Sequence, residues 1–183
     1  MNIFETAIDG VRIIESSFFR DERGAFSRLF CDRELFSILG QRQVVQINQS
    51  VTYKIGVIRG LHYQIPPQAE MKIIRCLRGR VFDVAVDLRQ GSPTFLQWVS
   101  VELSPQKHNA FIIPEGCAHG FQVLESNSEL LYLHTAYYTV SCEAGLHFSD
   151  PMIAINWPLP PLDLSIRDQN HPFLSEHFSG LLL

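Results

Sequence analysis

Short apolar runs separated by Gly, Pro, Asn and Ser dominate the middle of the chain, from about residue 43 to residue 138. The runs are rich in β-branched and aromatic residues, which favour strands. They read VVQINQS, GVIRGLHYQ, KIIRCL, VFDVAVDL, FLQWVSVEL, AFIIP, HGFQVL and LLYLHTAYY. Closely spaced short strands of this kind predict an all-β sandwich or barrel.

Three local patterns refine this prediction. Alternation in VFDVAVDL (81–88) predicts a strand whose even-numbered residues form its one buried face. The segment DRELFSILG (32–40) predicts a short helix with Asp32 as N-cap and Gly40 as C-cap. The proline-rich tail from residue 157 excludes long regular structure, so we expect an ordered segment packed over the barrel.

Composition limits the class of protein. The 183 residues, 46% hydrophobic and 19% charged, fit a single domain (1–183) with a sizeable core. The net charge is −4 and no block of like charges is present, which argues against a nucleic-acid or membrane partner. The N-terminal residues lack a signal-peptide pattern, so we expect a cytoplasmic protein. Four scattered cysteines without a CxxC pair then indicate free buried thiols.

Candidate chemistry lies in two segments, HYQ (62–64) and PEGCAHGF (114–121). The second contains Pro-x-Gly-x-x-His, the second signature of cupin barrels, in which a turn delivers a histidine onto a strand facing the barrel interior. Metal-binding cupins carry His-x-His and a Glu in the first signature, whereas Gln64 replaces the second of these histidines here. An amide is a poor transition-metal ligand. We therefore expect a cupin-type jelly-roll barrel without a metal ion.

A histidine and a lysine inside such a barrel suit carbon acid chemistry. Burial favours a neutral imidazole, so His62 qualifies as a general base, with Asp168 of the irregular tail as the acid that orients it. Lys72 would stabilise an enolate oxygen. Tyr132 is the candidate acid for the opposite face of the substrate. Each of these residues could also have a purely structural role in the core or at the rim of the barrel, so the hypothesis depends on their combination.

Strand periodicity places further side chains near this group. Arg59 precedes His62 by three positions, so strict alternation puts the two on opposite faces. Both line one cavity only if Gly60 forms a β-bulge, of which a strand glycine is often the mark. Period two also places three side chains of the last run on one face: Tyr132, His134 and Tyr138.

Nearly end to end, the chain resembles the dTDP-4-dehydrorhamnose 3,5-epimerases of nucleotide-sugar biosynthesis. The segments that carry the resemblance are FRDERGAF (19–26), RGLHYQ (59–64), KIIRCLRGRVFDVAVDLRQGSPTF (72–95), IPEGCAHGF (113–121), LYLHTAYY (131–138), DPMIAINWP (150–158) and LSIRD (164–168). The resemblance implies a cupin-type jelly roll, a homodimer and an activity without metal or organic cofactor. It also implies a place in the supply of activated sugars to polysaccharides such as O-antigen.

The resemblance assigns roles to individual residues. It implies His62 as the base oriented by Asp168, Lys72 as the enolate-stabilising cation and Tyr132 as the acid. A ketone at C4 acidifies the protons at C3 and C5, and removing each proton and returning another to the opposite face inverts that centre. The implied substrate-binding residues are Arg23, Gln46, Asn48, Arg59, His119, Tyr138, Glu143 and Arg167.

Three segments depart from the family's usual pattern. GAFSR carries Arg28 where a glutamate usually lies near the nucleobase, so Arg28 joins the substrate-binding set and the nucleotide stays open between dTDP and GDP or CDP. QINQS replaces the flanking Asp and His of the usual QDNHS. YLHTAYY replaces YKTTDYY and introduces His134, which shares a face with Tyr132 and either tunes it or has a structural role.

Three functional hypotheses remain open from the sequence. The first is an epimerase of a nucleotide-linked 4-keto-6-deoxyhexose that inverts C3 and C5, or only one of them. The second is a metal-dependent cupin enzyme, such as a dioxygenase or sugar isomerase, that uses His62 and His119. The third is a non-catalytic barrel that binds a nucleotide sugar or serves only in assembly.

Overall fold

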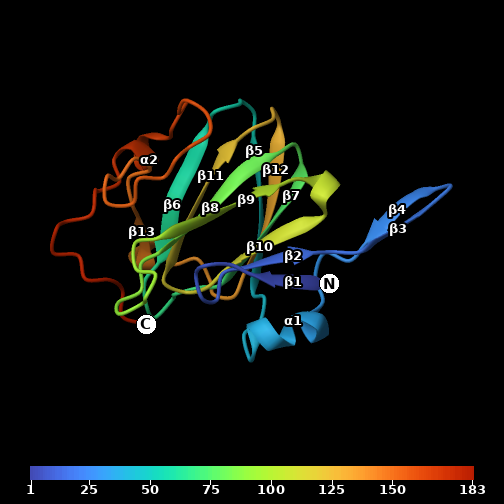
Figure 1. Cartoon of the computed structure of the whole chain (residues 1–183), viewed down its shortest axis with the longest axis horizontal. Coiled ribbons are helices and arrows are strands. Elements are labelled where there is room, and N and C mark those ends of the chain that lie inside the picture. Colours follow the sequence, from blue (N-terminus) through green and yellow to red (C-terminus); the bar gives the residue numbers. More distant parts are fainter.

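Two facing antiparallel sheets form a cupin-type jelly roll, and the computed structural model describes residues 1–183 (Figure 1). The six-stranded sheet contains, in spatial order, β1 (Asn2–Glu5), β2 (Arg12–Glu15), β10 (Asn109–Ile113), β7 (Lys72–Arg78), β12 (Ser128–His134) and β5 (Gln46–Thr52). The five-stranded sheet contains β13 (Glu143–Gly145), β6 (Ile58–Gln64), β11 (Cys117–Val123), β8 (Val81–Asp87) and β9 (Trp98–Leu103). The all-β prediction is confirmed.

The eight predicted runs correspond to strands β5 to β12. Strands β1, β2 and β13, and the separate hairpin of β3 (Phe18–Asp21) and β4 (Gly24–Ser27), lay outside the prediction. All residues of β1 and β3 are exposed, so no buried face imprints an alternation on their sequences. Two 3-10 turns, at Pro105–Lys107 and Val140–Cys142, complete the connections.

Strand β8 is buried on both faces, so the prediction of one buried face is wrong. Val81 and Ala85 belong to the core between the two sheets. Val84 and Val86 face the other way and belong to a second cluster, against which Trp157 of the C-terminal tail packs. The tail therefore covers the outer face of this sheet, as expected, and that cover is what buries the second side of the strand.

The predicted helix is present as α1 (Asp32–Leu39), with one difference at its start. Its N-cap is Cys31, and Asp32 is instead the first helical residue, where its negative charge suits the helix dipole. Gly40 is the C-cap, with φ of 58°, and its N–H donates to the carbonyl of Phe36 at 2.8 Å. Leu35 is fully buried against the outer face of the six-stranded sheet.

The structure describes the state of the four cysteines and the character of the helices. All four cysteines are free, as expected; three of them are buried and Cys31 is half-buried. No helix has both the length and the apolar character needed to cross a membrane.

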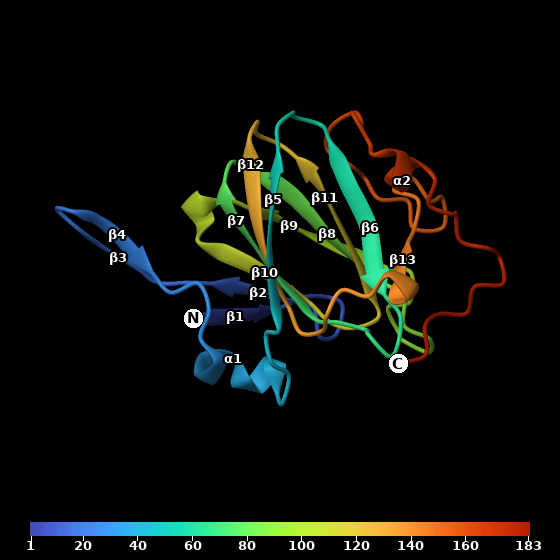
Figure 2. The same cartoon turned by 180° about the vertical axis from the view of Figure 1, so that it is seen from behind.

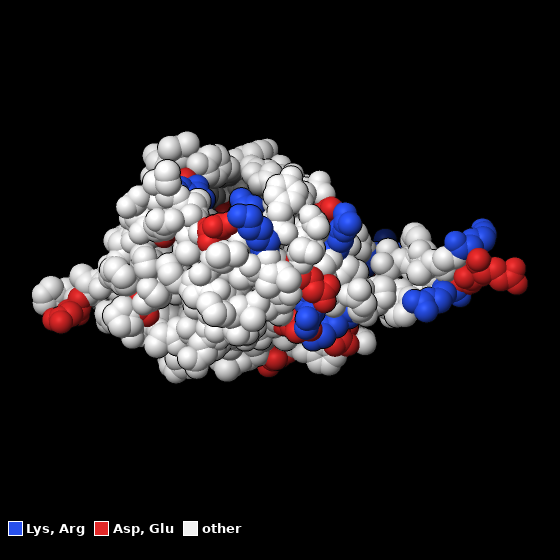
Figure 3. All heavy atoms as spheres, turned by 90° about the horizontal axis from the view of Figure 1, so that it is seen from above, with Lys and Arg blue, Asp and Glu red and all other residues white.

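The β3–β4 hairpin, here called the arm, projects away from both sheets (Figures 1 and 2). Phe19 and Phe26 face each other in its register and are 72% and 69% exposed. Charged residues gather at its far end (Figure 3), where the turn carries Arg23. The arm therefore presents large apolar side chains that the chain itself leaves uncovered.

Candidate active site

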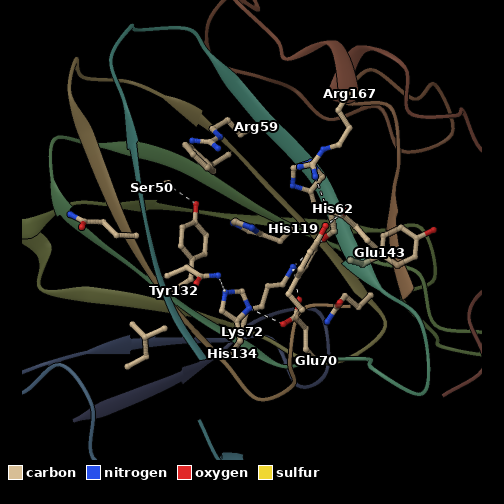
Figure 4. Close-up of a pocket in the computed structure, with 17 residues that line it drawn as sticks. Ser50, Arg59, His62, Glu70, Lys72, His119, Tyr132, His134, Glu143 and Arg167 are labelled. Carbon is tan, nitrogen blue, oxygen red and sulfur yellow. Dashed lines mark hydrogen bonds and ion pairs between the residues drawn. The ribbon is translucent and has the colours of Figure 1, made fainter. Parts of the chain in front are cut away.

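A cavity of about 530 Å³ opens between the two sheets at one end of the barrel (Figure 4). Strands β5, β7 and β12 contribute one wall, and β6 and β11 contribute the other. Nine of the predicted site residues line it: Asn48, Arg59, His62, Lys72, His119, Tyr132, Tyr138, Glu143 and Arg167.

His62 on β6 is bonded to Asp168, a buried residue of the short tail helix α2 (Ile166–Gln169). Nε2 of His62 lies 2.7 Å from Oδ1 of Asp168. The Ser165 hydroxyl caps α2 by accepting from the backbone N–H of Asp168 at 3.0 Å, which fixes where the carboxylate points. The expected neighbourhood of these two residues is confirmed, although they lie far apart in the sequence.

Burial lowers the pKa of His62, and this outweighs the raising effect of the Asp168 carboxylate. Burial by itself would raise the pKa of Asp168, but its hydrogen bonds with His62, Ser165 and the backbone of Gly60 reverse the direction and lower it. The pair is thus an ionised carboxylate beside a neutral imidazole. Nε2 of His62 also lies 3.1 Å from Nη2 of Arg167, and because a guanidinium only donates, its two neighbours favour opposite tautomers. The shorter contact, with the Asp168 carboxylate, places the imidazole proton on Nε2 and the basic lone pair on Nδ1.

Gly60 allows Arg59 and His62 to line the same cavity. The pairing of β6 with β11 shifts register here, with His62 opposite His119 and Arg59 opposite Phe121. Gly60 has φ of +124°, and a Cβ at this position would lie 2.5 Å from Cα of Gly120. The predicted bulge is confirmed, and only glycine fits it.

Lys72 on β7 is 8% exposed, and its ammonium lies among polar groups of the cavity wall. Nζ lies 3.2 Å from Oε1 of Glu70 and 3.5 Å from the carbonyl oxygen of His62. The other carboxylate oxygen of Glu70 lies 2.7 Å from Nδ1 of His134. The cation is therefore held beside the candidate base by a carboxylate that has its own imidazole partner.

Tyr132 on β12 enters the cavity from the wall opposite His62 (Figure 4). Its hydroxyl lies 3.2 Å from Oγ of Ser50. Burial raises the pKa of this phenol, so the group stays protonated and can donate a proton. The ring of His134 stacks at 6.0 Å and 19°.

His119, a predicted site residue, and Gln64 both line the cavity and are engaged in buried hydrogen bonds. Nε2 of His119 lies 2.8 Å from Oδ1 of Asp83, a fully buried carboxyl whose pKa burial raises. Gln64 donates to the carbonyls of Gln68 and Tyr137 and accepts from a backbone N–H at 2.8 Å. The Gln64 amide is thus used by the backbone around the cavity.

The mouth of the cavity carries an ion pair. Nη1 of Arg167 lies 2.7 Å from Oε1 of Glu143, whose other oxygen accepts from the hydroxyl of Tyr138 at 2.8 Å. Gln46 does not line the cavity; its side-chain oxygen accepts from the backbone N–H of Tyr138 at 3.1 Å. Tyr138 lies beyond the end of β12, so it reaches the cavity from a loop rather than from the strand face predicted for it.

Arg23 and Arg28 do not line the cavity of their own chain. Arg23 pairs with Asp21 at 2.6 Å in the arm, and Arg28, just after the arm, pairs with Glu34 of α1. Both side chains are more than half exposed. A single chain therefore does not bring these two residues together with the others.

Four residues near the cavity lay outside the sequence prediction: Ser50, Glu70, Asp83 and His171. Asp83 had a signal, because it is a charged residue between apolar neighbours, Phe82 and Val84. Glu70 had only its closeness to Lys72, in the segment AEMK. His171 lies behind the base, with Nε2 at 3.6 Å from Oδ1 of Asp168, and no local pattern marks it.

A barrel with an imidazole–carboxylate pair, an ammonium and a phenol around one cavity defines an isomerase of the cupin type. The family model for dTDP-4-dehydrorhamnose 3,5-epimerase matches residues 5–176. The chain belongs to this family, and it is an epimerase that acts on a nucleotide-linked 4-keto-6-deoxy sugar.

Individual relatives agree with this assignment. The dTDP-4-dehydrorhamnose 3,5-epimerase of Shigella flexneri is 44% identical over 171 residues, 93% of this chain and 94% of that protein. The dTDP-6-deoxy-D-glucose-3,5-epimerase RmlC of Legionella pneumophila, solved with dTDP-4-keto-L-rhamnose, has a TM-score of 0.89 and 44% identity over 94% of this chain and 92% of that one. ChmJ of Streptomyces bikiniensis, a 3'-monoepimerase solved with dTDP-quinovose, has a TM-score of 0.85 and 32% identity over 92% of this chain and 85% of that one.

Proposed function

We propose that the protein converts dTDP-4-dehydro-6-deoxy-D-glucose into dTDP-4-dehydro-L-rhamnose, using no metal or organic cofactor. The observation that carries the proposal is the convergence of the His62–Asp168 pair, Lys72 and Tyr132 on one cavity. The Legionella relative, bound to dTDP-4-keto-L-rhamnose, supports the same nucleotide and sugar. The product would supply an activated deoxysugar to polysaccharides such as O-antigen.

The reaction needs one base, one cation and one acid. Nδ1 of His62 takes the proton from C3 or C5, and the electron pair moves onto the C4 oxygen as an enolate. The Lys72 ammonium stabilises that oxygen. Tyr132 gives its hydroxyl proton to the opposite face of the same carbon, which inverts the centre. The Asp168 carboxylate offsets the positive charge that His62 acquires.

Arginines suit the diphosphate of the substrate. A planar guanidinium pairs with two phosphate oxygens at once. Arg59 and Arg167 line the cavity on the same side as His62. Arg167 is engaged by Glu143, so a bound diphosphate would compete with that carboxylate for the guanidinium.

We also propose that residues 1–183 form one domain that works as a cytoplasmic homodimer. The arm supports the dimer, because its exposed phenylalanines need a second surface to cover them. Arg23 and Arg28 are carried at and beside the arm, out of reach of their own cavity. In a dimer formed through the arms, both would reach the partner's cavity and complete the substrate-binding set there.

Solvent exchange tests the proposed reaction. In D₂O, the wild-type protein is expected to introduce deuterium at C3 and at C5 of dTDP-4-keto-6-deoxyglucose, read by NMR and mass spectrometry. His62→Ala is expected to lower the rate by roughly a hundredfold or more, the scale of general-base catalysis. His177→Ala, which removes an exposed histidine of the tail, is the matched control and should not change the rate.

The same experiment separates the alternatives. Deuterium at one carbon alone would make the protein a single-centre epimerase, as ChmJ is named. Exchange with a GDP- or CDP-linked ketosugar but not with the dTDP-linked one would correct the nucleotide. No exchange with any of them would refute the proposal in favour of a non-catalytic barrel. Full exchange by His62→Ala would refute the role of His62 as the base.

Elemental analysis of the active protein tests the metal-dependent alternative. His62 and His119 lie opposite each other on β6 and β11, but each imidazole is bonded to a different carboxylate. An ion could use only the Nδ1 atoms of these imidazoles, and the Gln64 amide, the third candidate ligand, is occupied by the backbone. Stoichiometric Fe, Mn, Ni or Zn on which activity depends would overturn the metal-free proposal.

A further inference from the structure

The Lys72 ammonium has three N–H donors, and the protein occupies two of them. One lies toward Oε1 of Glu70 at 3.2 Å and another toward the carbonyl oxygen of His62 at 3.5 Å. Because Lys72 lines the cavity, its third donor remains for a ligand there. Glu70 is the only carboxylate in direct contact with this ammonium.

His134 holds Glu70 in place from the other side. An ionised carboxylate only accepts, so Nδ1 of His134 donates to Oε2 of Glu70 at 2.7 Å. Nε2 of His134 lies 3.3 Å from the amide nitrogen of Asn48, which only donates, so Nε2 accepts. His134 and Lys72 are also direct register partners across β12 and β7. Each polar atom of the imidazole therefore has a partner.

The charges around Lys72 explain why such a carboxylate is needed. Arg59 and Arg167 line the same cavity, so an almost buried ammonium without a counterion would be disfavoured. Burial by itself would raise the pKa of Glu70, but the hydrogen bond from His134 and the charge of Lys72 outweigh it and lower the pKa. Glu70 is therefore ionised. The remaining titratable groups that interact with Lys72 are His62 on β6 and Asp83 on β8.

We propose that Glu70 and His134 are positioning residues for Lys72: His134 fixes the Glu70 carboxylate, and Glu70 holds the ammonium in place with one N–H left for the enolate oxygen. This inference rests on the proposed role of Lys72 in the epimerisation. His134 belongs to a segment in which the chain departs from the family's usual YKTTDYY, so the pair is a feature of this chain rather than of that pattern.

Chemical labelling tests the link between Glu70 and Lys72 without any substrate. Acetic anhydride reacts only with the neutral amine, so an anion that favours the ammonium slows the reaction. At pH 7.5, Glu70→Gln is expected to increase acetylation of Lys72 about tenfold or more relative to Lys107 in the same digest. His134→Leu should give a smaller increase. Glu129→Gln, at the other end of β12, is the matched control and should give none.

Kinetics test the positioning. Glu70→Gln should lower kcat by about 10- to 100-fold and leave the Kd for dTDP unchanged, which also verifies that the variant folds. His134→Leu should lower kcat about tenfold. His134→Asn should restore most of it, because the side-chain amide nitrogen of asparagine can occupy the place of the imidazole Nδ1 and donate to Glu70.

Each outcome bears on a different part of the inference. Unchanged labelling of Lys72 in Glu70→Gln would overturn it, whatever the kinetics. Increased labelling with an unchanged kcat would also overturn it, since Lys72 would then not depend on the pair for catalysis. If wild-type protein catalyses no exchange, the proposed function fails by itself, and the labelling still decides whether Glu70 interacts with the Lys72 amine in solution.

Discussion

Replacing Asp168 with asparagine isolates the charge that supports the candidate base. The amide has nearly the shape of the carboxylate, and its oxygen can still accept from Nε2 of His62. The variant therefore keeps the packing of α2 and the lone pair on Nδ1 of His62. What it loses is the negative charge beside an imidazole that becomes positive when it takes a proton from carbon.

The size of the effect follows from the geometry. The two charges would be separated by 2.7 Å, for which an effective dielectric constant of about 20 gives an attraction of about 6 kcal/mol. His62 is 24% exposed at its side chain, so solvent weakens this attraction. Hydrogen bonds to charged groups contribute about 1.5–3 kcal/mol in proteins. A loss of about 3 kcal/mol from the transition state corresponds to a kcat/KM lowered about a hundredfold.

The dependence of activity on pH provides a second, independent test, because the direction in which it shifts can be predicted. His62 acts when neutral, so activity rises with pH through the pKa of His62. That pKa is already lowered by burial, and Asp168 acts to raise it. Removing the carboxylate lowers it further, so the acidic limb of kcat/KM should move to lower pH in Asp168→Asn while the plateau falls.

The assay is deuterium exchange at C3 and C5 measured as a function of pH. Asp163→Asn makes the same chemical change in the same tail, where Asp163 pairs with Lys54 at the surface, and should leave both rate and profile unchanged. A kcat/KM within threefold of wild type would refute the reasoning. So would an acidic limb that moves to higher pH, because the carboxylate would then not favour the charged imidazole.

Three further predictions concern the acid, the bulge and the arm. Tyr132→Phe should lower the formation of inverted product by a hundredfold or more, while deuterium still exchanges on the face of the substrate that His62 contacts. Both are measured by NMR, the exchange in recovered substrate. An equal loss of inversion and of exchange would argue against Tyr132 as a separate acid. Gly60→Ala should lower the free energy of unfolding by about 3 kcal/mol or more, because its Cβ meets Cα of Gly120 at 2.5 Å; an unchanged urea midpoint would contradict the close approach. Phe19→Asp with Phe26→Asp should give a monomer in sedimentation that keeps the wild-type far-UV circular dichroism spectrum, whereas a persistent dimer would place the interface elsewhere.

The barrel was predictable from local patterns where a strand is buried. Strands β6 to β12 carry apolar runs because their side chains contribute to the core, so their sequences reveal them. Strand β5 is mostly exposed and was predicted from its β-branched residues and its flanking run. Strands β1 and β3 are fully exposed and left no such pattern. The double burial of β8 depends on a tail far away in sequence, and no window around Val84 contains that information.

Site residues could be predicted from the sequence where a motif or the alternation of a strand placed their side chains in the barrel interior. His62, Lys72 and Tyr132 lie on strands around the cavity, and the glycine before His62 revealed the bulge that admits Arg59. The hydrogen bond between Glu70 and His134 joins residues 64 positions apart, and no local sequence pattern predicts it. Arg23 reaches no cavity within one chain, so its placement is a question about assembly.

The delivery of Asp168 by the C-terminal tail has a consequence for how the protein is made. Proteins leave the ribosome from the N-terminus, so every strand around the cavity is synthesised before the residue that orients His62. A chain interrupted before α2 would retain the cavity walls but lack the partner of its base. Such a product would also lack Arg167, which lines the mouth of the cavity. On the proposed mechanism, the chain can become catalytically competent only after α2 has been synthesised and Asp168 has bonded to His62.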